Sequence, residues 1–439
     1  MDMVTPRRQL IQALRECLPG RSALLLGLLL RLLLMPLFLG GEWTAALARR
    51  GAPAVARPGG GGGPATPLET LRDKVAGAAS LVAGSRTAEV VAGEPAVTWQ
   101  TASQGDWVPR ATFLLKVPLL LADAIALVAL LALPAVGALP LEARRRLAAA
   151  WVLNPVLILT VYVLGSTEVL AVAAFLTGLS LTGRGQGGAT LAAVALVVAG
   201  ALAPVTIVLT FFYAQVTFDS GRHKARLVLA AVAGAVLRLG LPLALGAASW
   251  KEIMAALSVA QSELGAAITI NEHELVRLQD HLPLYPFLLA IAATALLLRA
   301  GGARNGAGER SGMLAVLFAL TVRVALAPVT LESLVWIVPC GVVVARDDTR
   351  CRWLLALLTA CAVLYSCQWG RATAGNLLAP ILPYEAFRWP APMELLGTFY
   401  DAGKLLDLVR TGLAACCAAI AWTSWRALGI GDKVDAHHA

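Results

Sequence analysis

The sequence predicts an all-α polytopic membrane protein with about twelve transmembrane helices and one large loop after the first of them. Two observations support this fold class. Hydrophobic residues make up 58% of the 439-residue chain and charged residues only 14%, more apolar surface than a soluble globule of this size can cover with a polar skin. The apolar runs also approach twenty residues, the length of a helix that crosses about 30 Å of hydrocarbon.

The first expected span, at 22–39, follows a basic N-terminal segment that contains Arg7, Arg8, Arg15 and Arg21. No small-x-small cleavage signal follows it, so we interpret it as an uncleaved helix. The later spans are expected at 113–137, 147–164, 168–182, 189–203, 205–217, 227–249, 283–300, 312–328, 331–345, 353–368 and 404–424. The two spans that meet at Ala203-Pro204 are short, and they form either full crossings or one re-entrant pair.

Basic turns set the expected orientation. They alternate along the chain, and with twelve spans all of them fall on the same side as the basic N-terminus: Arg144-Arg145-Arg146, Arg184, Arg222 with Lys224 and Arg226, Arg304 with Arg310, and Arg346 with Arg350 and Arg352. By the positive-inside rule this side is cytosolic. Both termini are therefore expected in the cytosol.

A polar insert at 41–110 is the largest departure from the apolar pattern. It contains the flexible glycine tract Gly59–Gly63, and then Thr66-Pro67-Leu68-Glu69, a helix-start signal followed by apolar residues at helical spacing. This segment predicts an amphipathic helix at the membrane surface. The expected organisation is a cytosolic N-terminus with the first span (1–40), a lumenal loop (41–110), a polytopic core (111–426) and a cytosolic tail (427–439).

The net charge of +9 is explained by the positive-inside bias of many turns, and no aromatic-interleaved basic patch indicates nucleic-acid binding. The seven cysteines lie mostly in or beside spans and have neither CxxC nor Cys/His metal spacing. A disulfide framework, a metal site and a cofactor are therefore not expected.

Polar residues inside spans are costly in lipid and are candidates for a role. Asp123 and Arg323 are interpreted either as structural groups that pair helices or as functional groups. Asn154-Pro155 predicts a kink whose freed carbonyl is satisfied by a neighbouring side chain. Outside the spans, Glu42 and then Asp106 are the carboxylates best placed to act as a base at the lumenal mouth, although solvated boundary residues have the same pattern.

Several short segments together resemble the PIG-U family, the multi-spanning subunit of the glycosylphosphatidylinositol (GPI) transamidase, within the GT-C class of membrane folds. In chain order they are Thr66–Val75, Pro118-Leu119-Leu120-Leu121-Ala122-Asp123-Ala124, Leu153-Asn154-Pro155, Gly165-Ser166-Thr167, Ala203-Pro204-Val205-Thr206, Ala327–Glu332 with Trp336 and Pro339, and Trp369-Gly370 through Asn376. Leu-Asn-Pro is shared with GT-C mannosyltransferases. Ala374 departs from the polar residue expected in the family.

The resemblance implies a non-catalytic subunit in the endoplasmic reticulum membrane. Such a subunit helps to bind the GPI lipid and works with other transamidase subunits, including a cysteine-protease-like catalytic one. It also implies that Asn376, with Thr373, Arg371 and Trp369, forms a polar rim near the lipid head group. The alternative is a GT-C glycosyltransferase, similar to mannosyltransferases, that uses a polyprenyl-phosphate-linked sugar with Glu42 or Asp106 as base.

Overall fold

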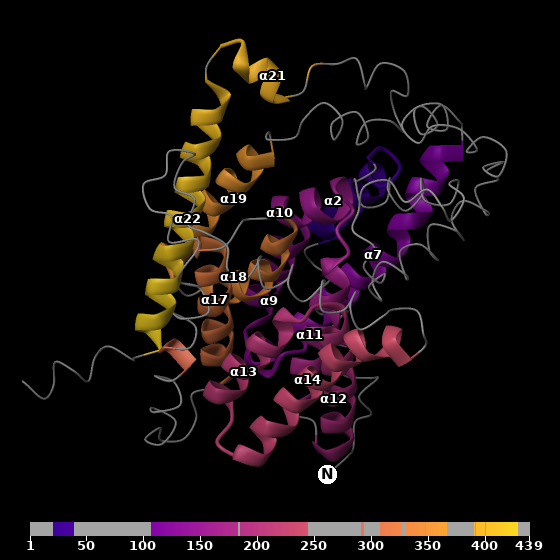
Figure 1. Cartoon of the computed structure of the whole chain (residues 1–439), viewed down its shortest axis with the longest axis vertical. Helices are drawn as coiled ribbons and strands as arrows, with labels where there is room; N and C mark the ends of the chain where they lie inside the picture. Colours follow the sequence, from indigo (N-terminus) through magenta and orange to yellow (C-terminus); the bar gives the residue numbers. More distant parts are fainter. Residues whose placement is uncertain are drawn as a thin grey trace, which may run out of the picture.

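The computed structural model describes residues 21–38, 107–182, 185–244, 291–293, 308–326, 331–346, 348–366, 390, 392–399 and 401–428. Within these ranges every regular element is helical and no strand occurs, so the all-α class is confirmed for this part of the chain (Figure 1). The predicted amphipathic helix after Thr66 lies outside the described residues. Most of the expected span at 283–300 does too.

The first helices differ from the expected spans mainly at their ends. Helix α2 (Arg21–Leu34) covers most of the first span, and α7 (Trp107–Leu131) begins six residues before the expected 113 and is followed by the short α8 (Pro134–Gly137). The next span is interrupted: α9 (Leu141–Val152) is followed by α10 (Pro155–Leu157) and the π-helical turn η2 (Ile158–Val163). Proline at 155 has no N–H to donate to a helix and causes this interruption.

The middle of the chain forms four helices close to the expected bounds: α11 (Glu168–Leu181), α12 (Gly185–Leu202), α13 (Val205–Thr217) and α14 (Gly221–Ala244). Gly165 lies between η2 and α11 with φ of 73°, a left-handed backbone that glycine adopts without a Cβ clash. At the Ala203-Pro204 break, Arg238 Nη1 donates to the carbonyl of Leu202 at 2.9 Å. Arg238 thus satisfies a carbonyl that the end of α12 leaves without a helical partner.

The C-terminal part contains α17 (Glu309–Leu326), the 3-10 helix η4 (Leu331–Trp336), α18 (Ile337–Ala345), α19 (Thr349–Tyr365), α21 (Pro392–Gly397) and α22 (Ala402–Ala427). Helix α22 packs against α17 and α19 along one flank of the molecule, while α7 packs against α11. Figure 1 shows α11 to α14 gathered at the lower end of the view.

Three helical stretches of the described chain are long and apolar enough to cross a membrane: Val108–Leu131, Leu141–Val163 and Gly403–Ala427. Shorter apolar helices are Ser22–Leu34, Glu168–Leu181, Gly187–Leu202, Val205–Thr217 and Leu331–Ala345. These coincide with further predicted spans, but each is shorter than the twenty or so residues of a perpendicular crossing.

Close backbone contact joins α12 to α14. A Cβ added to Gly200 would lie 2.2 Å from the carbonyl oxygen of Ala231, and one added to Gly234 would lie 2.0 Å from that of Val197. Either distance is far inside van der Waals contact, so this interface requires glycine at both positions. Small residues at helix crossings are the usual means of tight packing between helices in lipid, where no hydrophobic force draws helices together.

Candidate functional site

A buried carboxylate joins three separate segments of the chain. Asp123, in the middle of α7, is 3% exposed and accepts three hydrogen bonds. They come from Arg31 Nε of α2 at 2.7 Å, Trp151 Nε1 of α9 at 2.8 Å and Tyr162 Oη of η2 at 2.7 Å. Asp123 therefore joins α2 to the two elements on either side of the Asn154-Pro155 kink.

Arg31 has partners beyond the carboxylate. It is 3% exposed, its Nη1 donates to the carbonyls of Gly27 and Val152, and its Cζ lies 5.2 Å from the centre of the Tyr162 ring. The carbonyl of Val152 is one that the kink frees, because the N–H of Val156 donates instead to Asn154 Oδ1 at 2.9 Å. Arg31 thus neutralises Asp123 and also donates a hydrogen bond to the carbonyl that the interruption of the helix leaves free.

Asn154 starts the helix that follows the kink. Its side-chain oxygen accepts from the N–H groups of Val156 and Leu157 at 2.9 and 3.2 Å, and Pro155 occupies the first helical position. An asparagine cap with proline directly after it satisfies N–H groups that the helix itself cannot. This geometry assigns Asn154 and Pro155 a structural part at the kink.

Lys116 is a second buried charge on α7. It is fully buried, and its ammonium group donates to the carbonyl of Phe38, at the end of the described first segment, and to the carbonyl of Tyr162 in η2. Lys116 and Asp123 are seven residues apart, which places them on one face of α7 two turns from each other. On this face of α7, Asp123 binds α2 and η2, and Lys116 binds η2 and the carbonyl of Phe38.

A further cluster lies where α11 begins. Glu168 accepts from Trp336 Nε1 at 2.8 Å, and the ring of Trp336 contacts Phe175 edge-on, with centroids 6.0 Å apart. Arg323 and Arg238 lie within electrostatic range of the Glu168 carboxylate. In the described chain Asp123 thus pairs with Arg31, and Arg323 is associated with Glu168 instead.

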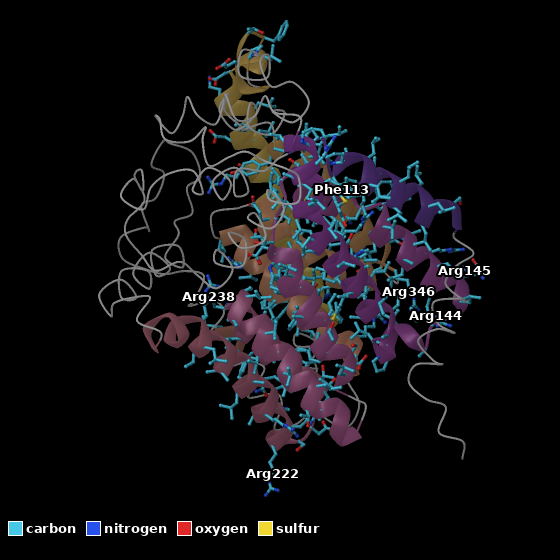
Figure 2. The ribbon with its side chains drawn as sticks, turned by 90° about the vertical axis from the view of Figure 1, so that its right-hand side faces the viewer. Phe113, Arg144, Arg145, Arg222, Arg238 and Arg346 are labelled. Carbon is cyan, nitrogen blue, oxygen red and sulfur yellow. The ribbon has the colours of Figure 1, made fainter. Side chains whose placement is uncertain are left out.

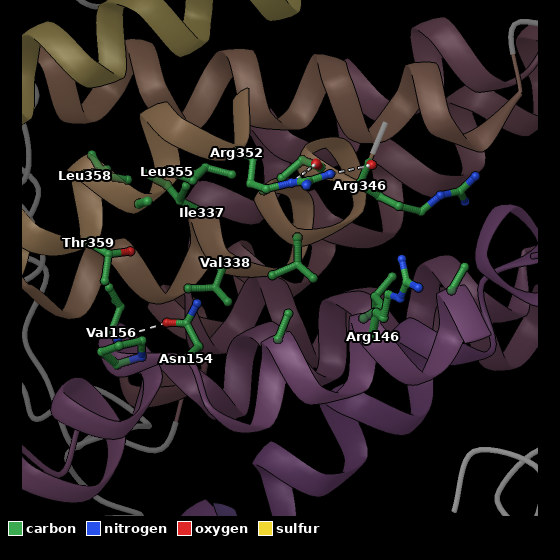
Figure 3. A pocket seen from close by; sticks show the side chains of 18 of the residues that line it. Arg146, Asn154, Val156, Ile337, Val338, Arg346, Arg352, Leu355, Leu358 and Thr359 are labelled. Carbon is green, nitrogen blue, oxygen red and sulfur yellow. Dashed lines mark hydrogen bonds between the residues drawn. The ribbon is translucent and has the colours of Figure 1, made fainter. Parts of the chain in front are cut away.

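An apolar groove of about 780 Å³ lies between α9, α18 and α19. Asn154 and Pro155 line one end of it, and Arg146, Arg346 and Arg352 the other (Figure 3). Such a volume is typical of sites for small organic molecules.

The remaining sequence-predicted site residues lie outside the described part of the chain. These are the rim residues Trp369, Arg371, Thr373 and Asn376, and the carboxylates Glu42 and Asp106. Within the described residues, no group of three or more His, Cys, Asp or Glu side chains is arranged to hold a metal ion.

Sequence reasoning missed Arg31 and Lys116 as members of the buried cluster. Each is a lone cation inside an apolar run, at Leu-Leu-Leu-Arg31-Leu-Leu-Leu and Phe-Leu-Leu-Lys116-Val-Pro-Leu. An isolated charge within an apolar run indicates a buried polar contact, because a charged side chain in lipid needs a partner. Which partner it takes depends on how distant helices pack.

The fold and these clusters define a helical protein with candidate membrane spans, whose helices are joined by buried, paired charges. The chain matches no protein-family model, no curated protein and no solved structure. Its function therefore has to be argued from its own residues.

Proposed function

We propose that the chain is a non-catalytic, PIG-U-like subunit of a GPI transamidase. In this role it binds the GPI lipid and scaffolds the attachment of GPI anchors to proteins. Its partners are the other transamidase subunits, among them a cysteine-protease-like catalytic one. The proposal includes a GT-C-like arrangement of about twelve spans in the endoplasmic reticulum membrane, with both termini in the cytosol.

One observation carries the proposal: four of the segments that resemble PIG-U proteins, those at 118–124, 153–155, 165–167 and 331–339, are far apart in sequence but lie close together in the described part of the chain. Asp123 of the second-span segment binds Trp151, two residues before Leu153-Asn154-Pro155. Asn154 and Pro155 line the same groove as Ile337 and Val338, which lie between Trp336 and Pro339. Trp336 binds Glu168, directly after Gly165-Ser166-Thr167.

These contacts place the four segments in one region of the described chain, where α7, α9, α10, η4 and α11 pack on one another, and a common location of the resembling residues supports the proposal. The proposal also fits the chemistry of Asp123. Its two oxygens are occupied by three donors, so this carboxylate serves helix association rather than proton transfer.

The test is affinity purification of the tagged full-length chain from its native membranes in mild detergent, with identification of the proteins and glycolipids that accompany it. We expect a protease-like subunit and GPI lipid to co-purify. Asn376→Ala and Trp369→Ala are expected to lower the amount of GPI lipid and leave the protein partners in place. Recovery of the chain with neither a protease-like partner nor GPI lipid contradicts the proposal.

A glycosyltransferase of the GT-C class is the second candidate, and the position of Lys116 favours it. Its ammonium group binds the carbonyl of Phe38, and Glu42 follows Phe38 by four residues in sequence. Glu42 lies outside the described residues, but a cation bound to the chain four residues before that carboxylate suits a reaction in which a phosphate group leaves. Sugar transfer from a polyprenyl-phosphate donor that Glu42→Gln or Asp106→Asn abolishes supports this enzyme and contradicts the scaffold.

A further inference from the structure

Three helices bring their basic ends together at one end of the groove. Arg146 lies in α9, Arg346 directly follows α18 and Arg352 lies in the first turn of α19, and all three line the groove. Figure 2 shows Arg144, Arg145 and Arg346 on one side of the molecule, with Arg222 at its lower tip. By the positive-inside rule, this end of the groove faces the cytosol.

The electrostatics at this end favour an anion. Among the residues that the structure describes, the lining contains three guanidinium groups and one carboxylate, that of Glu142, and Glu142 forms an ion pair with Arg145. Arg352 donates to the backbone carbonyls of Ala345 and Arg346 at 3.3 and 3.1 Å, partners that leave its net charge intact. Helices α9 and α19 also begin here, but Glu142 lies in the first turn of α9 and Asp348 caps α19, so the attraction for an anion comes from the arginines rather than from the helix N-termini.

The rest of the groove is apolar and runs toward the middle of the expected span. Arg146 and Asn154 are eight residues apart, which is about 12 Å along a helix. Between them the lining consists of residues such as Ala150, Val338 and Leu355, and Asn154 and Thr359 lie at the far end (Figure 3). Two residues of the lining, Ala150 and Ala356, are exposed in the structure, so the groove can be reached from outside the protein at these positions.

We propose that this groove binds an anionic glycerophospholipid from the cytoplasmic leaflet. Its phosphate-containing head group lies against Arg146, Arg346 and Arg352, and an acyl chain lies along Ala150 toward Asn154. An anionic head joined to an apolar tail matches a basic end joined to an apolar groove, and guanidinium groups bind phosphate oxygens by paired hydrogen bonds. This lipid is distinct from the GPI lipid expected at the lumenal rim, and its binding does not depend on the proposed function.

The test uses the full chain in nanodiscs that contain equal amounts of phosphatidylcholine and phosphatidylserine, followed by native mass spectrometry of the lipids that remain bound. We expect preferential retention of phosphatidylserine. Arg146→Gln should lower that preference about fivefold, the size of one basic contact with an anionic lipid surface. Ala150→Phe should fill the groove and lower the retention of both lipids.

Arg222→Gln is the matched control, because Arg222 is an exposed arginine of another basic turn. It should leave the lipid preference unchanged, and melting curves should show that all the variants are folded. Equal retention of the two lipids by the unchanged protein overturns the proposal, as do equal effects of Arg146→Gln and Arg222→Gln. Cross-linking of Ala150→Cys to a peptide of this chain, or to another protein, rather than to lipid also overturns it.

Discussion

Replacement of Asp123 by alanine tests whether the buried cluster holds α2 in place. The change leaves the Arg31 guanidinium, which is 3% exposed, without its counter-charge, and it removes the acceptor of Trp151 and Tyr162. An unpaired arginine within a membrane helix costs about 3 kcal/mol, and each lost hydrogen bond between membrane helices about 0.6 kcal/mol. We therefore expect a loss of about 4 kcal/mol, or about a thousandfold in the folding equilibrium.

The assay is unfolding of the purified protein by titration with a denaturing detergent, followed by tryptophan fluorescence. Asp219→Ala is the control, because Asp219 is an exposed carboxylate between α13 and α14. The double variant Arg31→Met/Asp123→Leu should recover the charge contribution, since paired removal of a buried ion pair is much less destabilising than removal of one partner. Equal stability of Asp123→Ala and Asp219→Ala would refute the reasoning.

Three further predictions concern helix packing and helix ends. Gly234→Ala places a methyl group 2.0 Å from the carbonyl oxygen of Val197, and we expect a loss of about 1–3 kcal/mol in the same unfolding assay. Asn154→Ala removes the cap at the kink and should destabilise the protein by about 1 kcal/mol. The backbone N–H of Lys404 holds the pKa of Asp401 below its ordinary value. The first turn of α22 should therefore stay ordered at pH values above the usual aspartate pKa and loosen as the pH falls through the lowered pKa of Asp401. The NMR chemical shifts of residues in this turn would report the change.

Each of these has a matched control. Gly221→Ala should be tolerated, because nothing lies within 4 Å of its added Cβ, and a similar effect at Gly221 and Gly234 would contradict the close-contact argument. Asn154→Ser keeps a neutral accepting oxygen and adds no charge to the helix, so a loss as large as that of Asn154→Ala would show that capping is not the cause. Asp401→Asn keeps an acceptor that does not titrate, and persistence of the pH effect in this variant would exclude Asp401 as its origin.

Much of the helical framework was predictable from sequence. The expected span at 205–217 coincides with α13, and that at 168–182 ends one residue beyond α11. Prolines at 155 and 204 predicted two breaks that the structure contains. The start of α7 was not predicted, because Pro109 and Arg110 separate Trp107 and Val108 from the apolar run that begins after them, although all four residues belong to the helix.

The candidate site was less predictable. Asp123 and Asn154 stand out in the sequence as polar residues inside apolar runs, but nothing in the sequence indicates that the partner of Asp123 is Arg31, 92 residues earlier. The groove was not foreseen at all. Its three arginines come from two basic turns that lie about 200 residues apart in the chain, and each turn, taken alone, indicates only which side of the membrane it faces.

The sequence by itself determined that this chain is helical and where most of its helices begin and end. Helix formation in an apolar setting is a local matter, because each backbone N–H and carbonyl finds its partner within the same segment and proline removes one. Only the tertiary structure decided that Arg31 neutralises Asp123, that Trp336 binds Glu168, and that three basic helix ends surround one groove. Those contacts join residues far apart in the chain, and they depend on how whole helices pack.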